Sequence, residues 1–492
     1  MNFFSLNFQK IKKNLIVIAL FFSTMTQALN QSTNQTFMFP KEIFGSYAME
    51  QASWHNILYN KYSHGAALQA YGYAQGSIPT NTASEYFSFD YLPQLMVQSG
   101  TPENYDVETF TRNILGAWIG IEGDENFSGS YSLTPQQSQY GATIAFSQDL
   151  SKYFDVAYLR NSSFTLSIPI VAIKNQLVFQ GSPTILNALQ GGNWMTMNLT
   201  ESWQYLILNE EIQESTQLTN MKIQFGSKYE SDDDVQIATT SFLTLPFVQS
   251  VSNEVLFQPA FGYNGHIVLG SGVVFQFPLT RSQDRLTRIC FFAGLENKFL
   301  FGNNQERTVE IDGKPYSRYM PLYDRYTDSM VPGVNVFTKN CLVEPFNIID
   351  FIAGFRYKYI DCIGEIGYEL WGHDTERITI NDTNPWQENR YGIANINGQG
   401  ELDPTIKTAS RSTINYVVPD IESNKYIKAS QLNMVTGASR ATLVHRAYMS
   451  YGYGKKTGTV DYIINLGLFI EVVQNNAAFS NFGGWLKTGA TF

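Results

Sequence analysis

Charged side chains and long apolar runs are both scarce in this chain. Asp, Glu, Lys and Arg make up 15% of its 492 residues, against about a quarter in ordinary soluble domains. After residue 28, no apolar stretch approaches the roughly 20 residues that a membrane-spanning helix needs. A soluble domain with so few charges would have an adhesive surface. The choice therefore lies between a soluble exported protein and a membrane β-barrel.

Cysteine and catalytic motifs are also sparse. The three cysteines, Cys290, Cys341 and Cys362, can form at most one disulfide bond, which excludes a disulfide scaffold. The five histidines are scattered singly, without the spacing of a zinc site, and no G-x-S-x-G nucleophile motif is present. We therefore predict a protein that is not an enzyme and that uses neither a metal nor a cofactor.

The N-terminal residues have the features of an export signal. Lys10, Lys12 and Lys13 precede an apolar run from Leu15 to Phe22, and small residues surround Ala28. This pattern is typical of a cleaved secretory signal peptide, which we place at residues 1–28. Its removal takes away three lysines and shifts the formal charge from −10 to −13. An acidic mature chain argues against nucleic acid as a partner.

Apolar and polar side chains alternate along most of the second half of the chain. From Ile267 to Leu279 the odd positions are mostly large and apolar, whereas the even ones include Gly270, Gly272 and Gln276. A period of two identifies strands. The alternation recurs in residues 289–301, 351–359, 365–370 and 462–472. A soluble sandwich also alternates, but the length of these runs and the 14% of aromatic residues favour tilted membrane-spanning strands.

The last residues continue this alternation and end on an aromatic side chain. Phe482, Leu486, Ala490 and Phe492 share one face of the expected closing strand, and Lys487 lies on the other. Together with the signal peptide and the alternating strands, this ending resembles bacterial outer-membrane β-barrels of porin-like type over residues 67–492. The resemblance implies that the barrel-insertion machinery reads Leu486, Ala490 and Phe492 as an insertion signal. It also implies passive passage of solutes.

Turn and loop lengths predict the direction of each strand. With Phe492 on the periplasmic side, the short links 359–361 and 454–458 fall inside, and the long stretches 303–346 and 374–428 fall outside. Long outer loops and short periplasmic turns are typical of transmembrane barrels. We therefore predict an all-β, antiparallel up-and-down barrel of about 16 strands, with 12–18 allowed.

The first half of the chain is less regular. Residues 113–123 are predicted to form a strand, and Asn264-Gly265 predicts a tight turn that follows a strand over 257–263. Counting strands back from this turn places residues 180–220 on the periplasmic side, which implies either a missed strand pair or an inward plug. Residues 29–66 form an N-terminal segment that we predict to be partly helical or plug-like.

Charged residues on the inward face of the predicted strands are the candidates for a pore lining. They are Glu122, Glu296, Lys298, Arg356, Lys358, Glu365, Glu369, Arg446 and Glu471. Neighbouring strands lie about 4.8 Å apart, so that these side chains can form rings across the lumen wall and select ions. Equally, they can neutralise one another and fill a narrow barrel. Acidic residues outnumber basic ones by one in this set, which predicts a weak cation preference.

The outer stretch 303–346 contains a candidate constriction loop. Its mixed charges and tyrosines include Asp312, Arg318, Tyr323, Asp324 and Arg325. Folded inward, this loop would narrow the pore, as the eyelet loop of general porins does. The alternative is an exposed loop, since loops usually run over the surface.

These features predict an outer-membrane pore, exported through a cleaved signal peptide, for passive diffusion of ions and small hydrophilic solutes. The alternative is a structural or adhesive outer-membrane barrel without an open channel. Strand number discriminates between them, because about 8 strands are filled by side chains whereas about 16 leave an aqueous lumen. The expected partners are outer-membrane lipid, the barrel-insertion machinery and small solutes, and assembly into a homo-oligomer is left open.

Overall fold

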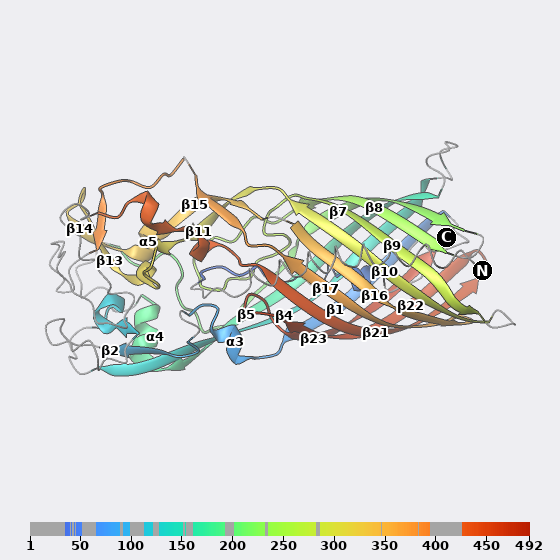
Figure 1. Cartoon of the computed structure of the whole chain (residues 1–492), viewed down its shortest axis with the longest axis horizontal. Coiled ribbons are helices and arrows are strands. Elements are labelled where there is room, and N and C mark those ends of the chain that lie inside the picture. The colour runs from blue at the N-terminus through green and yellow to red at the C-terminus, as the bar shows by residue number, and fades with distance from the viewer. Residues whose placement is uncertain are drawn as a thin grey trace, which may run out of the picture.

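The chain forms a closed barrel with a folded layer at one end (Figure 1). The computed structural model describes residues 35–39, 41, 44, 46–51, 65–88, 92–98, 113–121, 127–150, 153, 161–191, 201–231, 235–281, 286–345, 347–381, 383–393 and 426–492. The predicted signal peptide, residues 1–28, and Glu122 lie outside these ranges. Within them, no helix is long and apolar enough to cross a membrane.

Twelve antiparallel strands of the described chain close into the barrel, each paired with its neighbour around the wall. In chain order they are β1 (Ala66–Ser77), β4 (Ser128–Asp149), β5 (Ser162–Gly181), β7 (Asn220–Glu230), β8 (Gln236–Pro246), β9 (Val268–Arg281), β10 (Thr287–Leu300), β16 (Asn347–Tyr359), β17 (Cys362–His373), β21 (Thr442–Thr457), β22 (Val460–Val473) and β23 (Asn481–Thr491). The last strand, β23, pairs with the first, β1. The prediction of an all-β antiparallel barrel is confirmed. The described barrel has 12 strands, the lower limit of the predicted 12–18, and not about 16.

The two ends of the barrel differ in their connections. At one end, which we call the inner end, a tight turn at Gly458 joins β21 to β22, and Thr491 of β23 pairs with Ala67. At the opposite, outer end, long connections follow β10 and β17. The short inner turn predicted at 359–361 is confirmed. The turn predicted at 454–458 is shorter than expected, because β21 continues to Thr457 and β22 begins at Val460. The described parts of 303–346 and 374–428 lie at the outer end, also as predicted.

The outward face of the barrel is apolar and the inward face is polar. On β22, Leu466, Leu468 and Ile470 are each more than half exposed, whereas Asn465 and Glu471 are buried inside. Exposed aromatic side chains gather near both ends of the strands, as they do at the two interfaces of a membrane. Near the inner end they are Tyr229, Tyr357, Tyr359, Tyr453, Tyr462 and Phe492, and near the outer end Phe247, Phe299, Phe301 and Phe482.

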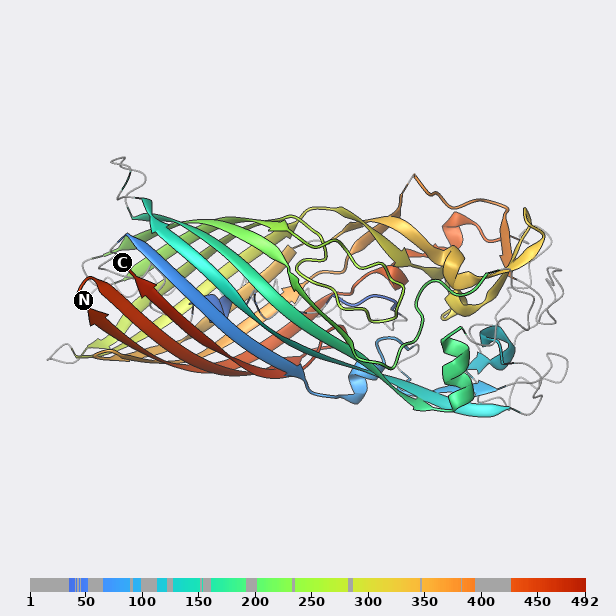
Figure 2. The same ribbon diagram turned by 180° about the vertical axis from the view of Figure 1, so that it is seen from behind.

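Strands β4 and β5 continue beyond the barrel and support the outer layer (Figure 2). Along these extensions lie β2 (Leu95–Gln98), β3 (Ile114–Leu115) and β6 (Gln213–Leu218), with the helices α3 (Asn81–Ser84) and α4 (Pro183–Leu189). The rest of the layer contains α5 (Gly333–Phe337) and three small sheets. These are β11 (Asn303–Thr308) with β15 (Thr338–Glu344) and β18 (Arg377–Ile380), β12 (Glu310–Ile311) with β20 (Leu432–Asn433), and β14 (Ser329–Pro332) with β13 (Pro321–Asp324) and β19 (Tyr391–Ile393).

The first half of the chain corrects three predictions. Residues 116–119 form a 3-10 helix rather than part of a strand, and Ile119 is buried. Asn264 and Gly265 both have positive φ, as the predicted tight turn requires, but residues 257–263 are not a strand. Counting these residues as a strand reversed the predicted direction of every strand that precedes them. The described part of 180–220 therefore lies at the outer end, between β5 and β7, and not on the periplasmic side.

Three glycines of the inner wall lie directly opposite large aromatic side chains. The cross-strand pairs are Gly270 with Phe242, Gly367 with Tyr448, and Gly467 with Trp485. The ring covers the glycine in each pair, so that an added Cβ on Gly467 would lie 2.1 Å from the Trp485 ring. These glycines give the aromatic rings room to lie flat against the strand. The glycine-rich inward face read from the sequence thus has a packing cause.

Replacing Gly467 with Ala should therefore displace Trp485 and destabilise the barrel by about 1–3 kcal/mol. The matched control is Gly364→Ala, because nothing lies within 4 Å of a Cβ at that site. The temperature at which the folded form converts to the unfolded form on a semi-denaturing gel measures the effect. Equal conversion temperatures for the two variants would contradict this packing argument.

Candidate functional site

The lumen of the barrel is occupied by the chain's own N-terminal segment. Its described residues between Gln35 and Gln51, which include the short helix α2 (Tyr47–Gln51), are almost all buried. The Tyr47 hydroxyl donates to the carbonyl of Val273 on β9 (3.4 Å), and α2 also packs against β16 and β17. We call these residues the lumen segment.

A four-residue charge cluster joins the lumen segment to the wall. Lys41 Nζ lies 2.8 Å from Glu471 Oε1 on β22 and 3.6 Å from Glu369 Oε1 on β17. Arg446 of β21 lies between the two carboxylates, with Nη1 2.8 Å from Glu369 and Nη2 2.7 Å from Glu471. The Ser46 hydroxyl contacts both Arg446 and Glu369. All four charges are buried, so each carboxylate depends on both cations for compensation.

Further charge pairs lie on other strands of the lumen wall. Lys222 of β7 contacts Glu50 of the lumen segment (2.9 Å) and Glu296 of β10 (3.7 Å). Lys298 joins Glu296 (2.9 Å) to Asp350 (2.7 Å).

The backbone of α2 is held in the same way. Arg356, which pairs with Glu365, donates to the carbonyl of Gln51 (3.2 Å), and Lys487 donates to the carbonyl of Glu50 (3.2 Å). The wall thus binds both the side chains and the backbone carbonyls of the lumen segment.

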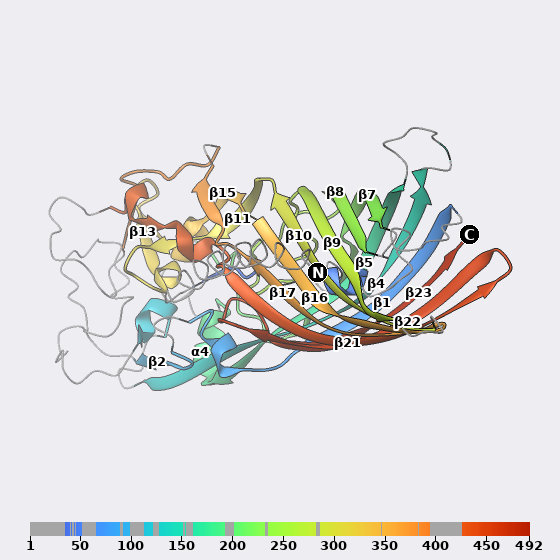
Figure 3. The ribbon, with the colours of Figure 1, turned by 45° about the vertical axis from the view of Figure 1, so that its right-hand side comes forward.

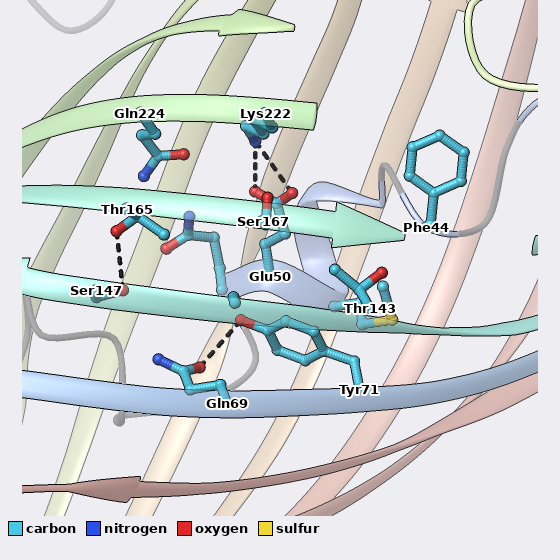
Figure 4. Close-up of a pocket in the computed structure, with 13 residues that line it drawn as sticks. Phe44, Glu50, Gln69, Tyr71, Thr143, Ser147, Thr165, Ser167, Lys222 and Gln224 are labelled. Carbon is cyan, nitrogen blue, oxygen red and sulfur yellow. Dashed lines mark hydrogen bonds and ion pairs between the residues drawn. The ribbon is translucent and has the colours of Figure 1, made fainter. Parts of the chain in front are cut away.

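A small cavity remains between the lumen segment and one part of the wall (Figure 4). Phe44, Glu50, Tyr71 and Lys222 are among its lining residues, and Glu50 points across the gap to Lys222. Its volume of about 50 Å³ has room for a few water molecules and no larger solute. A hydrated solute cannot use this space while the lumen segment is in place.

The outer mouth of the barrel holds the start of the lumen segment. The guanidinium carbon of Arg307 lies 3.3 Å from the centre of the Phe37 ring, and Arg307 pairs with Glu376 (3.3 Å). Gln305 accepts from Arg307 (2.6 Å) and contacts Nε2 of His266 (2.8 Å). His266 Nδ1 lies 2.7 Å from the carbonyl of Phe301. Because that carbonyl only accepts, Nδ1 carries the proton, and Nε2 accepts from the Gln305 amide.

Most of the predicted pore-lining residues lie on the inner wall. Glu296, Lys298, Arg356, Glu365, Glu369, Arg446 and Glu471 all face the lumen and are buried there. Lys358, near the inner end of β16, is exposed. In the described chain these seven side chains pair with one another, with Lys222 or Asp350 of the wall, with the lumen segment or with uncharged wall residues.

The predicted constriction loop lies in the outer layer and not in the barrel (Figure 3). Arg318 is buried against Glu310 and the Tyr316 ring, and Asp324 accepts from Arg390 Nε (2.9 Å). Tyr323 donates to Asp328, and Arg325 lies over Tyr426. Asp312 accepts from Asn433 (3.5 Å). The loop folds outward because its own small sheets and hydrophobic core satisfy its side chains.

Five residues of the site were missed in the sequence: Lys41, Glu50, Lys222, Asp350 and Lys487. Asp350 is an even number of positions from Arg356 on the same strand and so shares its inward face. Lys487 lies on the predicted inward face of the closing strand. Both could therefore have been found from the alternation. Lys41 and Glu50 gave no signal, because strand alternation says nothing of a segment threaded through the lumen. The predicted insertion-signal residues Leu486 and Phe492 are exposed on the outward face, and Ala490 shares that face.

No protein-family model and no curated protein matches the sequence. Among solved structures, an outer-membrane channel from Pseudomonas putida F1 is similar over 88% of this chain and 98% of its own, with 8% identity and a TM-score of 0.35. The transport unit of the autotransporter AIDA-I from Escherichia coli covers 96% of both chains, with 8% identity and a TM-score of 0.28. A FadL homologue from Pseudomonas aeruginosa is similar over 94% of this chain and 99% of its own, with 9% identity and a TM-score of 0.28. Because these scores are low, the barrel is identified from the pairing of this chain's own strands.

Removing the Lys41 charge should destabilise the folded protein. Lys41→Met leaves Glu369 and Glu471 with Arg446 as their remaining cation in this cluster, and a buried charge without compensation costs about 3–5 kcal/mol. Adding Glu471→Gln should restore part of the loss, because it removes the excess negative charge. Urea unfolding of the two single variants and the double variant measures the coupling. Lys428→Met, at an exposed lysine of the outer layer, is the control. If Lys41→Met and Glu471→Gln change the free energy of unfolding additively, the two residues are not coupled and the cluster is contradicted.

Acid should destabilise the folded protein at the outer mouth, because His266 is buried there in its neutral form. Burial, with the Arg307 charge as a smaller cause, lowers the pKa of His266 to about 4. The unfolded chain takes up this proton near pH 6.5, so the contribution of His266 is complete above pH 6.5 and is lost as the pH falls towards 4, at roughly 1.4 kcal/mol per pH unit. His266→Gln should have a shallower pH dependence of its urea midpoint between pH 7 and 4. If the urea midpoints of the wild type and His266→Gln depend on pH with the same slope, His266 is not a neutral, buried imidazole.

Proposed function

We propose that this protein is an outer-membrane β-barrel that carries ions and small hydrophilic solutes only when the lumen segment moves out of the barrel. The observation that supports this proposal most directly is the occupied lumen. A charged wall holds the segment by ion pairs and backbone contacts, while the segment's apolar side chains pack with wall residues in two hydrophobic clusters. The polar contacts can be exchanged for water when the segment leaves, and the apolar clusters favour the closed state.

Location in an outer membrane is supported by the outward face. Its apolar side chains form a band between two sets of exposed aromatic residues, as in barrels that contact lipid. Export through a cleaved signal peptide at residues 1–28 and recognition of Leu486, Ala490 and Phe492 by insertion machinery remain part of the proposal.

The size and charge of the lumen set what can pass. Twelve strands lie between the roughly 8 that side chains fill and the 16 or more that leave a wide channel. With the lumen segment gone, the wall would present nearly balanced charges, among them Glu369, Glu471, Arg446 and Lys298. A weak cation preference remains our proposal, because a field from nearly balanced charges selects only weakly.

A structural or adhesive barrel is the second candidate. The outer layer favours it, because β4 and β5 extend beyond the barrel to carry a folded layer with its own hydrophobic core. In that case the lumen segment is a permanent part of the core, and the lumen never opens.

Channel recordings in a planar bilayer discriminate between the two. We expect the wild type to be mostly closed, with rare openings, and the charge-reversal variant Lys41→Glu/Glu50→Lys to be open for a larger fraction of time. The reversal places like charges against Glu471 and Lys222 and so expels the lumen segment. A deletion of residues 35–51 should give steady conductance.

The matched control is Lys428→Glu/Glu211→Lys, which reverses two exposed charges of the outer layer and should behave as the wild type. Each variant is recorded only after a heat-modifiable band shows that its barrel has folded. Folded variants that stay silent would support the structural barrel and contradict the channel.

A further inference from the structure

The lumen segment has a definite direction. Its first described residues bind groups at the outer end: Gln35 N–H donates to the carbonyl of Tyr86 (3.2 Å) and Thr36 N–H to that of Thr436 (2.9 Å). Phe39 N–H donates to the Ser439 hydroxyl (2.9 Å). Tyr86 follows the outer end of β1, and Ser439 precedes the outer end of β21. The lumen segment therefore begins at the outer mouth.

Later residues bind progressively closer to the inner end. Lys41 contacts Glu471, two residues from the outer end of β22. The carbonyl of Gln51 accepts from Arg356, near the inner end of β16. The chain then resumes as β1 at the inner end, where Ala66 N–H donates to the carbonyl of Phe492 (2.8 Å). From Gln35 to Gln51 the contacts thus trace one passage through the lumen, from outside to inside.

From this single passage we infer that the chain threads its own barrel. With the proposed outer-membrane location and cleavage after residue 28, on which this step rests, the mature N-terminus lies on the outer face of the membrane. A chain that arrives from the inner side has to carry its N-terminal end outward through, or together with, the closing barrel. The barrel then acts as the conduit that delivers its own N-terminus to the cell surface. This inference goes beyond the proposed channel, because it holds whether or not the lumen ever opens to solutes.

The unmodified protein provides the test. Intact cells are treated with a membrane-impermeant amine reagent, and labelled peptides are identified by mass spectrometry. Lys428 is exposed in the outer layer, whereas Lys455 and Lys456 are exposed near the inner turn. We expect the mature α-amino group to label on intact cells as Lys428 does, and Lys455 and Lys456 to label only after permeabilisation.

Labelling of the α-amino group only after permeabilisation would overturn the inference. If that group is chemically blocked, an epitope inserted between Asn30 and Gln31 replaces it as the probe. Antibody binding on intact cells then supports the threaded chain, and binding only after permeabilisation, as for the same epitope inserted at Gly458, rejects it. Bilayer conductance affects neither result, so a failure of the channel proposal remains distinguishable.

Discussion

Two carboxylates, Glu369 and Glu471, lie in the lumen on either side of one wall cation, Arg446. A buried pair of negative charges is stable only when two positive charges compensate it. The second charge comes from Lys41, which belongs to the lumen segment and not to the wall. The barrel and its N-terminal segment therefore depend on each other electrostatically. The pairs of Glu50 with Lys222 and of the Gln51 carbonyl with Arg356 repeat this dependence on other strands of the lumen wall.

The same constraint explains how a barrel of this size is filled. Side chains of the wall alone do not close a lumen of 12 strands, and three glycines let large aromatic rings lie against the wall. In the described chain, the lumen segment fills much of the remaining space, and a small cavity lies beside Lys222. Its apolar side chains pack into clusters with the wall and favour a closed resting state, whereas its ion pairs can be exchanged for water if the segment is displaced. The outer layer adds a fixed frame at the mouth, where Arg307 holds Phe37.

The strand pattern made the wall predictable. Alternation identified the inward charges of β10, β16, β17, β21 and β22, and loop lengths gave the direction of the strands in the second half. Both signals are local, with a period of two residues and a contrast between short and long connections. The central value of 16 strands was too high, although 12 is the lower limit of the predicted range. The apolar residues of 113–121 belong to the core of the outer layer, as the burial of Ile119 shows. Those of 257–263 pack partly in that core and partly against the lumen segment. Lys41 and Glu50 could not be assigned partners, since a threaded segment meets residues hundreds of positions away.

The central claim is that the lumen segment lies inside the barrel of the folded protein in its membrane. A photoreactive phenylalanine analogue in place of Tyr47 tests it most directly, because the Tyr47 hydroxyl contacts the backbone of Val273 in the lumen wall. The account predicts that irradiation of intact membranes cross-links position 47 within the same chain to the β9 peptide that contains Val273. Cross-links to periplasmic proteins, or no internal cross-link in a folded, heat-modifiable barrel, would contradict it.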